Sequence, residues 1–195
     1  MKTAGKCVLV IIVLLIIAGV GAVAFLYSGI YNVSASYPDS KLADWVFSTT
    51  SDNSVRRHAR SVKPQPLDDP ALLKRGAAHF AGMCVGCHGA PGTAQDEVAE
   101  GLMPSPPEYT ELTEDWTSSE VFWIVKNGIR MTAMPCFGKT HDDDAIWAIV
   151  AFTEQLKTLS PDDYKKAVGA AGPMDEDEKP GQPAKPAAGA PKKGA

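Results

Sequence analysis

The amino-acid sequence predicts an all-α protein in which one N-terminal transmembrane helix precedes a helical domain. An uncharged apolar run of twenty residues occupies Val8–Tyr27. Further along, apolar residues recur at three- or four-residue spacing in segments that open with helix-capping residues. The chain of 195 residues is 45% apolar and has a net charge of −4. It therefore has room for one globular domain and some appendages, not for two domains with separate cores.

Charge and cysteine content exclude two classes of protein. The charge balance is mild and no basic face dominates, which argues against a nucleic-acid binder. Four cysteines in a chain of this length are too few for a disulfide scaffold. The spacing of the cysteines therefore matters more than their number.

The first segment, residues 1–27, is interpreted as a signal-anchor helix. As a helix, the apolar run spans about 30 Å, the thickness of the hydrocarbon core of a bilayer. Lys2 and Lys6 precede it and no charge follows until Asp39, so the N-terminus is expected in the cytoplasm. The rest of the chain is then expected on the periplasmic or outer face of the inner membrane. A cleaved signal peptide is the alternative, but cleavable apolar cores are usually only about 7–15 residues long.

Three further segments follow the apolar run. Residues 28–67 are expected to form a linker with short amphipathic helices, residues 68–168 the compact domain, and residues 169–195 a disordered tail. The linker carries Arg56, Arg57 and Arg60, which would suit lipid headgroups or an acidic surface, or would be a solvated face. The tail is rich in Pro, Ala and Lys and has almost no large apolar side chain to bury.

The first helix of the domain is predicted to begin at Asp68-Asp69-Pro70, which offers capping residues and a proline for the first turn. Gly76, Phe80 and Cys84 follow at intervals of four and share one face. A glycine at this place lets another helix approach the backbone closely, and the final helix is its natural partner.

Two more helices are predicted after a loop. Gly101–Leu112 is too rich in proline for a helix or a central strand. Thr117–Glu120 then reads as a capping box, which opens a short helix that ends before Gly128. The last helix, residues 142–159, has three acids in its first turn. Its apolar residues Ile146, Trp147, Val150 and Leu156 recur at helical spacing.

The motif that carries the chemistry is Cys84-Val85-Gly86-Cys87-His88. C-x-x-C-H is the attachment signature of a c-type haem, in which both thiols bond to one porphyrin and the adjacent imidazole faces the iron. A thioredoxin-like pair would need a preceding strand, whereas a helix precedes this motif. A structural disulfide would leave His88 without a role. Cys84, Cys87, Cys136 and a histidine would be an acceptable ligand set for zinc, but zinc sites of this kind more often pair two C-x-x-C or H-x-x-H units.

The iron would need a sixth ligand or an open site. The chain offers seven candidates: Met83, Met103, Met131, Met134, His58, His79 and His141. Met134 precedes a proline, so its backbone is extended and suits a loop laid across the distal face. Met131, three residues upstream, is the nearest competitor. A thioether opposite a histidine is the ligand pair of an electron-transfer haem with a raised potential.

These motifs resemble those of class I cytochromes c. The resemblance rests on the Gly-x3-aromatic-x3-Cys helix before C-x-x-C-H, on Asn127–Arg130 followed by Thr132–Pro135, and on Trp147–Phe152 in the last helix. It covers about residues 68–167 and is closest to small, membrane-anchored monohaem members of bacterial respiratory chains. It implies three principal helices around one covalently held haem c, with Met134 as distal ligand. Ala133 and Cys136 depart from the usual pattern.

The function implied by this resemblance is outer-sphere electron transfer. The protein is expected to be an electron carrier rather than an enzyme, with no small-molecule substrate. The expected donor is a quinol-oxidising complex and the expected acceptor a terminal oxidase or reductase. Two other readings stay open: a fixed haem subunit of a larger membrane oxidoreductase, and a haem-based ligand sensor with a labile distal site. The domain carries sixteen acidic and eight basic side chains, which predicts a partner with a basic docking patch.

Overall fold

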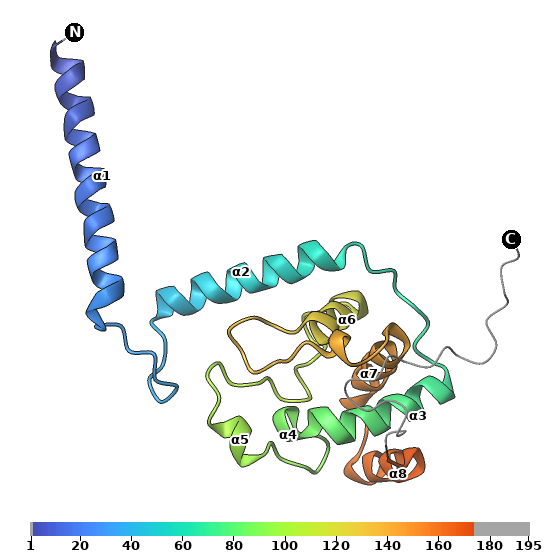
Figure 1. Cartoon of the computed structure of the whole chain (residues 1–195). Coiled ribbons are helices and arrows are strands. Elements are labelled where there is room, and N and C mark those ends of the chain that lie inside the picture. Colours follow the sequence, from blue (N-terminus) through green and yellow to red (C-terminus); the bar gives the residue numbers. More distant parts are fainter. Residues whose placement is uncertain (1, 174–195) are drawn as a thin grey trace, which may run out of the picture. The chain divides into compact units, whose positions relative to one another are not determined.

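The fold was examined in a computed structural model, in which residues 2–173 are described. The chain divides into two units, residues 1–37 and residues 38–195. The first unit contains one helix, α1 (Lys2–Ser28) (Figure 1). Its segment Ala4–Ser28 is long and apolar enough to cross a membrane. The predicted N-terminal apolar helix is therefore confirmed as a candidate membrane span.

The described part of the second unit contains helices and no β-strand, as the predicted fold class requires. Two of its helices are very short. In chain order the helices are α2 (Lys41–Ala59), α3 (Pro70–His79), α4 (Val85–His88), α5 (Glu97–Glu100), α6 (Ser118–Asn127), α7 (Asp143–Leu156) and α8 (Pro161–Ala171). A π-helical turn, η1 (Phe80–Cys84), joins α3 to α4, and a 3-10 turn, η2 (Phe137–Lys139), precedes α7.

The core of this unit lies around α7, which packs against α3 on one side and α6 on another. Gly76 of α3 lies directly against the backbone of α7. A Cβ atom there would lie 2.0 Å from the carbonyl oxygen of Ala148 and 2.8 Å from the Cβ of Phe152. The predicted close approach between the glycine face and the last helix is confirmed. This crossing fixes the direction of α3 and therefore the position of the cysteine motif that follows it.

The helix ends follow the predicted capping signals. Asp69 caps α3, with Pro70 in the first turn. Thr117 and Glu120 form a complete capping box on α6, and Gly128 ends that helix at φ +67°. Asp142 caps α7 through its side chain. The predicted last helix, residues 142–159, corresponds to α7, which ends at Leu156, and a further helix that was not predicted, α8, begins at Pro161.

Two predicted boundaries and one predicted set of helices need correction. Residues 38–67 are not a separate linker, because α2 packs on α6 within the second unit. The segment also forms one helix of 19 residues, whereas one or two short helices were expected. The predicted domain end at residue 168 falls inside α8, which continues to Ala171 and packs on α3. The predicted disordered tail lies, from residue 174 on, outside the described residues.

Candidate cofactor site

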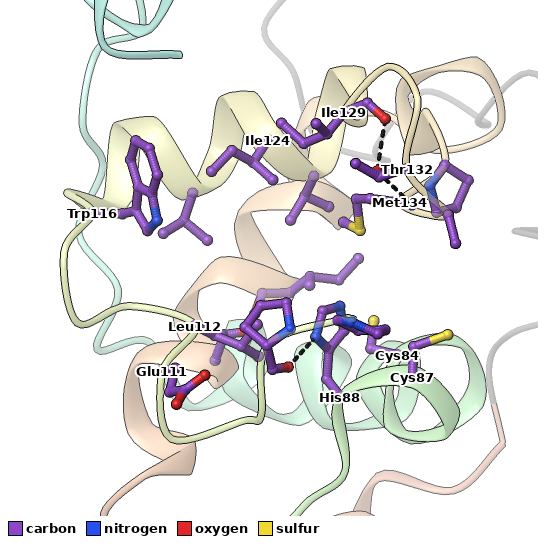
Figure 2. Close-up of a pocket in the computed structure, with 18 of the residues that line it drawn as sticks. Cys84, Cys87, His88, Glu111, Leu112, Trp116, Ile124, Ile129, Thr132 and Met134 are labelled. Atoms are coloured by element: carbon purple, nitrogen blue, oxygen red, sulfur yellow. Dashed lines mark hydrogen bonds between the residues drawn. The ribbon is translucent and has the colours of Figure 1, made fainter. Parts of the chain in front are cut away.

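The position of the cysteine motif is determined by three successive elements, α3, η1 and α4. Helix α3 continues directly into η1, in which Cys84 is buried. Helix α4 follows and contains Cys87 and His88. Gly89 follows at φ +67° and ends the helix, so the chain turns away directly after the histidine. The two thiols and the imidazole therefore lie together on one wall of a cavity (Figure 2).

His88 is oriented by a hydrogen bond to the loop that crosses below it. Its Nδ1 lies 2.8 Å from the carbonyl oxygen of Pro107, and the Tyr109 amide donates to the His88 carbonyl at 2.8 Å. Donation from Nδ1 leaves Nε2 as the nitrogen with a free lone pair. Burial lowers the pKa of His88, and the bond to Pro107 opposes that shift. A neutral, fixed imidazole is the form that can ligate a metal.

Met134 lies on the opposite wall of the cavity from His88 (Figure 2). Its loop is stabilised locally. The Thr132 hydroxyl donates to the Ile129 carbonyl at 2.8 Å and accepts from the Met134 amide at 3.1 Å. The Ile129 amide donates to the Met134 carbonyl at 3.2 Å. These bonds fix the backbone that carries the thioether.

Met131, the competing ligand candidate, does not line the cavity. Its side chain is 88% exposed, and its backbone has φ +64°. It is the only non-glycine residue with positive φ in the described part of the chain, so Ala133 occupies an ordinary backbone conformation. The departure at Ala133 from the usual glycine therefore costs no backbone strain here.

The other ligand candidates are placed as follows. Met83 lines the cavity from η1, the turn that also carries Cys84. Met103 and His58 are exposed and do not line it. His79 and His141 are buried against each other, with ring centroids 5.3 Å apart, outside the cavity lining. Of these five residues only Met83 lines the cavity, and it does so from the turn that carries Cys84.

The cavity itself has a volume of about 690 Å³. This lies within the roughly 300–1,000 Å³ usual for pockets that hold organic ligands and cofactors. Most of its lining is apolar and comes from α6, α7 and the loops between α5 and α7. The principal apolar members are Leu112, Trp116, Val121, Ile124, Val125, Ile129, Phe137 and Ile149. An apolar chamber with two thiols, an imidazole and a thioether at its walls fits a haem.

The geometry of the cysteines in residues 2–173 does not support a disulfide or a zinc site. The four cysteines are free, so Cys84 and Cys87 form no disulfide. Within residues 2–173 no group of three or more His, Cys, Asp or Glu side chains is arranged to hold a metal ion. Cys136 instead donates its thiol to the Lys126 carbonyl at 3.2 Å. Cys136 is half-buried. Burial raises the pKa of the Cys84 thiol to about 12.

Comparison with protein families identifies the segment that holds this site. Residues 71–152 match the family model described as cytochrome C oxidase, cbb3-type, subunit III. Residues 71–152 form a class I cytochrome c domain. A search of curated proteins finds no match to the chain. The cytochrome domain binds haem and has a haem-based electron-transfer role, which fits an electron carrier better than a catalytic enzyme.

Sequence reasoning missed one part of this site. Ser51 and Val55 of α2 line the cavity of the cytochrome domain from outside the matched segment. The sequence offered only a weak signal for this contact. Val55 and Ala59 are four residues apart, as on one helical face, but the arginines around them suggested a solvated surface.

Proposed function

We propose that this protein is a membrane-tethered carrier of single electrons that holds one covalently attached haem c. In this proposal Cys84 and Cys87 form the thioethers, and His88 and Met134 are the axial ligands. The observation that carries it is the position of His88 and Met134 on opposite walls of one apolar cavity, with both cysteines beside the histidine. The proposal takes Met134 rather than Met131 as distal ligand, because Met131 is 88% exposed.

The chain's own residues supply orientation and exclusion of water. The Pro107 carbonyl holds the His88 ring, and the Thr132 hydrogen bonds hold the loop of Met134. When bound, haem supplies an iron that cycles between ferrous and ferric states without making or breaking bonds to a substrate. Fixed ligands and apolar walls keep the site's geometry similar in both states, which favours fast electron transfer.

The cellular setting of the proposal follows from α1. Lys2 and Lys6 precede the apolar span, which supports a cytoplasmic N-terminus and a haem domain on the periplasmic face of the inner membrane. The proposed donor is a quinol-oxidising complex and the proposed acceptor a terminal oxidase or reductase. An uncleaved α1 would hold the cytochrome domain close to both.

A second candidate is a fixed haem subunit of a membrane oxidase. The name of the matching family, which is that of an oxidase subunit, favours it. The two candidates differ in whether the protein leaves its partner. A subunit would be purified from mild detergent together with other redox chains, whereas a separate carrier would be purified alone.

Spectroscopy of the full-length protein, reduced and oxidised, tests the central proposal. We expect a low-spin haem that resists extraction by acidified organic solvent and that does not bind CO. Rapid CO binding would instead indicate a sensor with a labile distal site. Absence of haem from protein expressed with a haem-attachment system would refute the proposal.

The axial ligand is tested by replacing each methionine. Met134→Ala should leave haem attached, lower its midpoint potential and admit CO, because the ferrous-stabilising thioether is lost. Met131→Ala is the matched control from the same loop and should change none of these. If the Met131 variant behaves as expected for Met134, the ligand assignment is wrong.

A further inference from the structure

Helix α2 lies outside the cytochrome match but belongs to the same structural unit. It runs beside α6, the helix that supplies three apolar residues of the cavity wall (Figure 1). Only one face of α2 is covered. Val55 is 1% exposed and Ala59 is 3% exposed, whereas Leu42, Trp45 and Phe47 at the other end are largely exposed. The C-terminal half of α2 is therefore the part that packs on the domain.

Two aromatic contacts fix that half of α2. The guanidinium carbon of Arg56 lies 5.3 Å from the centroid of the Trp116 ring. The His58 ring stacks on Trp123 at 5.7 Å between centroids and 27° between planes. Trp116 itself lines the cavity. The cation therefore lies over a ring that belongs to the cavity wall, and a cation–π contact of this kind contributes about 0.5–1 kcal/mol at exposed sites.

Directly before these two anchoring residues, Val55 reaches the cavity. It and Ser51 are the two lining residues that α2 contributes. The only side-chain atoms that Val55 can offer are methyl groups, which leave no polar atom for a water molecule to bind. A dry wall matters for a haem site. Water near the iron stabilises the more highly charged ferric state and thereby lowers the reduction potential.

We propose that α2 is a wall of the haem cavity and that Val55 is a positioning residue, which keeps water and small external ligands out of it. The segment between the membrane span and the cytochrome domain then has a part in setting the potential, in addition to linking the two. This inference rests on the proposed haem site and adds a structural element that the family match does not contain.

The test uses the full-length protein with substitutions at two valines of the same helix. Val55→Thr adds a hydroxyl at constant shape, and Val55→Ala opens the wall. We expect both to lower the midpoint potential and to speed the binding of imidazole to the ferric protein. Val46→Thr and Val46→Ala are the matched controls, since Val46 is 42% exposed and does not line the cavity. They should leave both quantities unchanged.

The anchoring of α2 is tested by a second pair of variants. Arg56→Ala removes the cover from Trp116, so we expect faster imidazole binding than in the parent protein. Arg57→Ala, an exposed neighbour that has no ring contact, is the control and should behave as the parent. Equal rates for the two arginine variants would show that this contact does not hold the wall.

The outcomes separate this inference from the proposed function. If the parent protein contains no low-spin haem, the proposed function fails. If the parent has such a haem, but both Val55 variants keep its potential and its imidazole binding rate, only the role of α2 fails. If Val55→Thr loses its haem and Val55→Ala keeps it, the role of α2 is still tested. The midpoint potential and the imidazole binding rate of the alanine variant alone then report whether water and ligands enter the cavity.

Discussion

Gly76 shows how one residue without a side chain determines the position of the cofactor site. It lies in α3 where the helix crosses α7, eight residues before Cys84. The backbone of Ala148 occupies the space that a Cβ atom would need. Since backbone cannot rotate away as a flexible side chain does, the two helices would have to separate. Any separation would also move the turn that carries Cys84.

We therefore predict that Gly76→Ala destabilises the haem-loaded protein. Overpacking of this kind costs about 1–3 kcal/mol, and contact with backbone belongs at the upper end of that range. Denaturant unfolding monitored by the haem absorbance would measure it. Gly169→Ala in α8 is the control, because no atom lies within 4 Å of the added Cβ. There the helix should gain up to about 1 kcal/mol. A neutral Gly76 variant would contradict the crossing described above.

His88 and Met131 illustrate what the sequence could and could not predict at this scale. The spacing of Cys84, Cys87 and His88 predicts the chemistry, but no pattern predicts that the Pro107 carbonyl would accept from the imidazole, nineteen positions away. The sequence also left Met131 and Met134 as competitors. The difference between them is that Met131 has a positive φ and an exposed side chain, which depends on the fold of the whole loop.

Among the helices, α6 depends most visibly on its first turn. The Glu120 carboxylate accepts from the Thr117 amide at 2.8 Å, and the Thr117 hydroxyl accepts from the Glu120 amide at 3.4 Å. The helix has only ten residues and carries Val121, Ile124 and Val125 into the cavity wall. Short helices rely on such caps because few internal hydrogen bonds stabilise them.

Thr117→Ala should reduce the free energy of unfolding by about 0.5–2 kcal/mol, since it removes one half of the capping box. Thermal unfolding of the haem-loaded protein is a suitable measurement. Ser118→Ala, one residue further along, is the control, because the side chain of Ser118 takes no part in the capping box. Equal loss in both variants would mean that the capping box is not the source of the loss, since alanine itself favours the helix.

At the scale of elements, the sequence predicted the helices that have both a cap and a regular apolar stripe. Those are α3, α6 and α7. It did not predict α8, although Ser160-Pro161 followed by two acids is a helix-start signal, because its apolar content is low. The π-helical turn η1 leaves no local signal, since its extra residue is determined by packing around Phe80 and Cys84.

For the molecule as a whole, charge is distributed unevenly along the chain. Residues 68–168 have a net charge of −8, and residues 36–67 have a net charge of +2. The cytochrome domain thus presents a negative surface to a redox partner, and the basic residues that balance it are concentrated in and after α2. Association driven by such a surface is long-ranged at low salt and screened at high salt.

Electron transfer from the reduced protein to a basic acceptor protein should therefore slow as ionic strength rises from about 0.01 M to 1 M, where the Debye length falls from about 30 Å to 3 Å. Stopped-flow measurement of haem oxidation would follow it. A small uncharged oxidant serves as the control, and its rate should be independent of salt. A basic acceptor whose rate rises with salt would exclude attraction to the acidic domain.

The burial of α7 has a further consequence for the motions of the domain. Every residue from Ala145 to Thr153 is buried, so this helix has no solvent-facing side along those two and a half turns. Its amide protons can then exchange with deuterium only when neighbouring helices separate, that is, in a nearly global opening. The exchange rate of these amides consequently reports the free energy of unfolding of the entire domain. Amides at the exposed end of α2 report only local fraying.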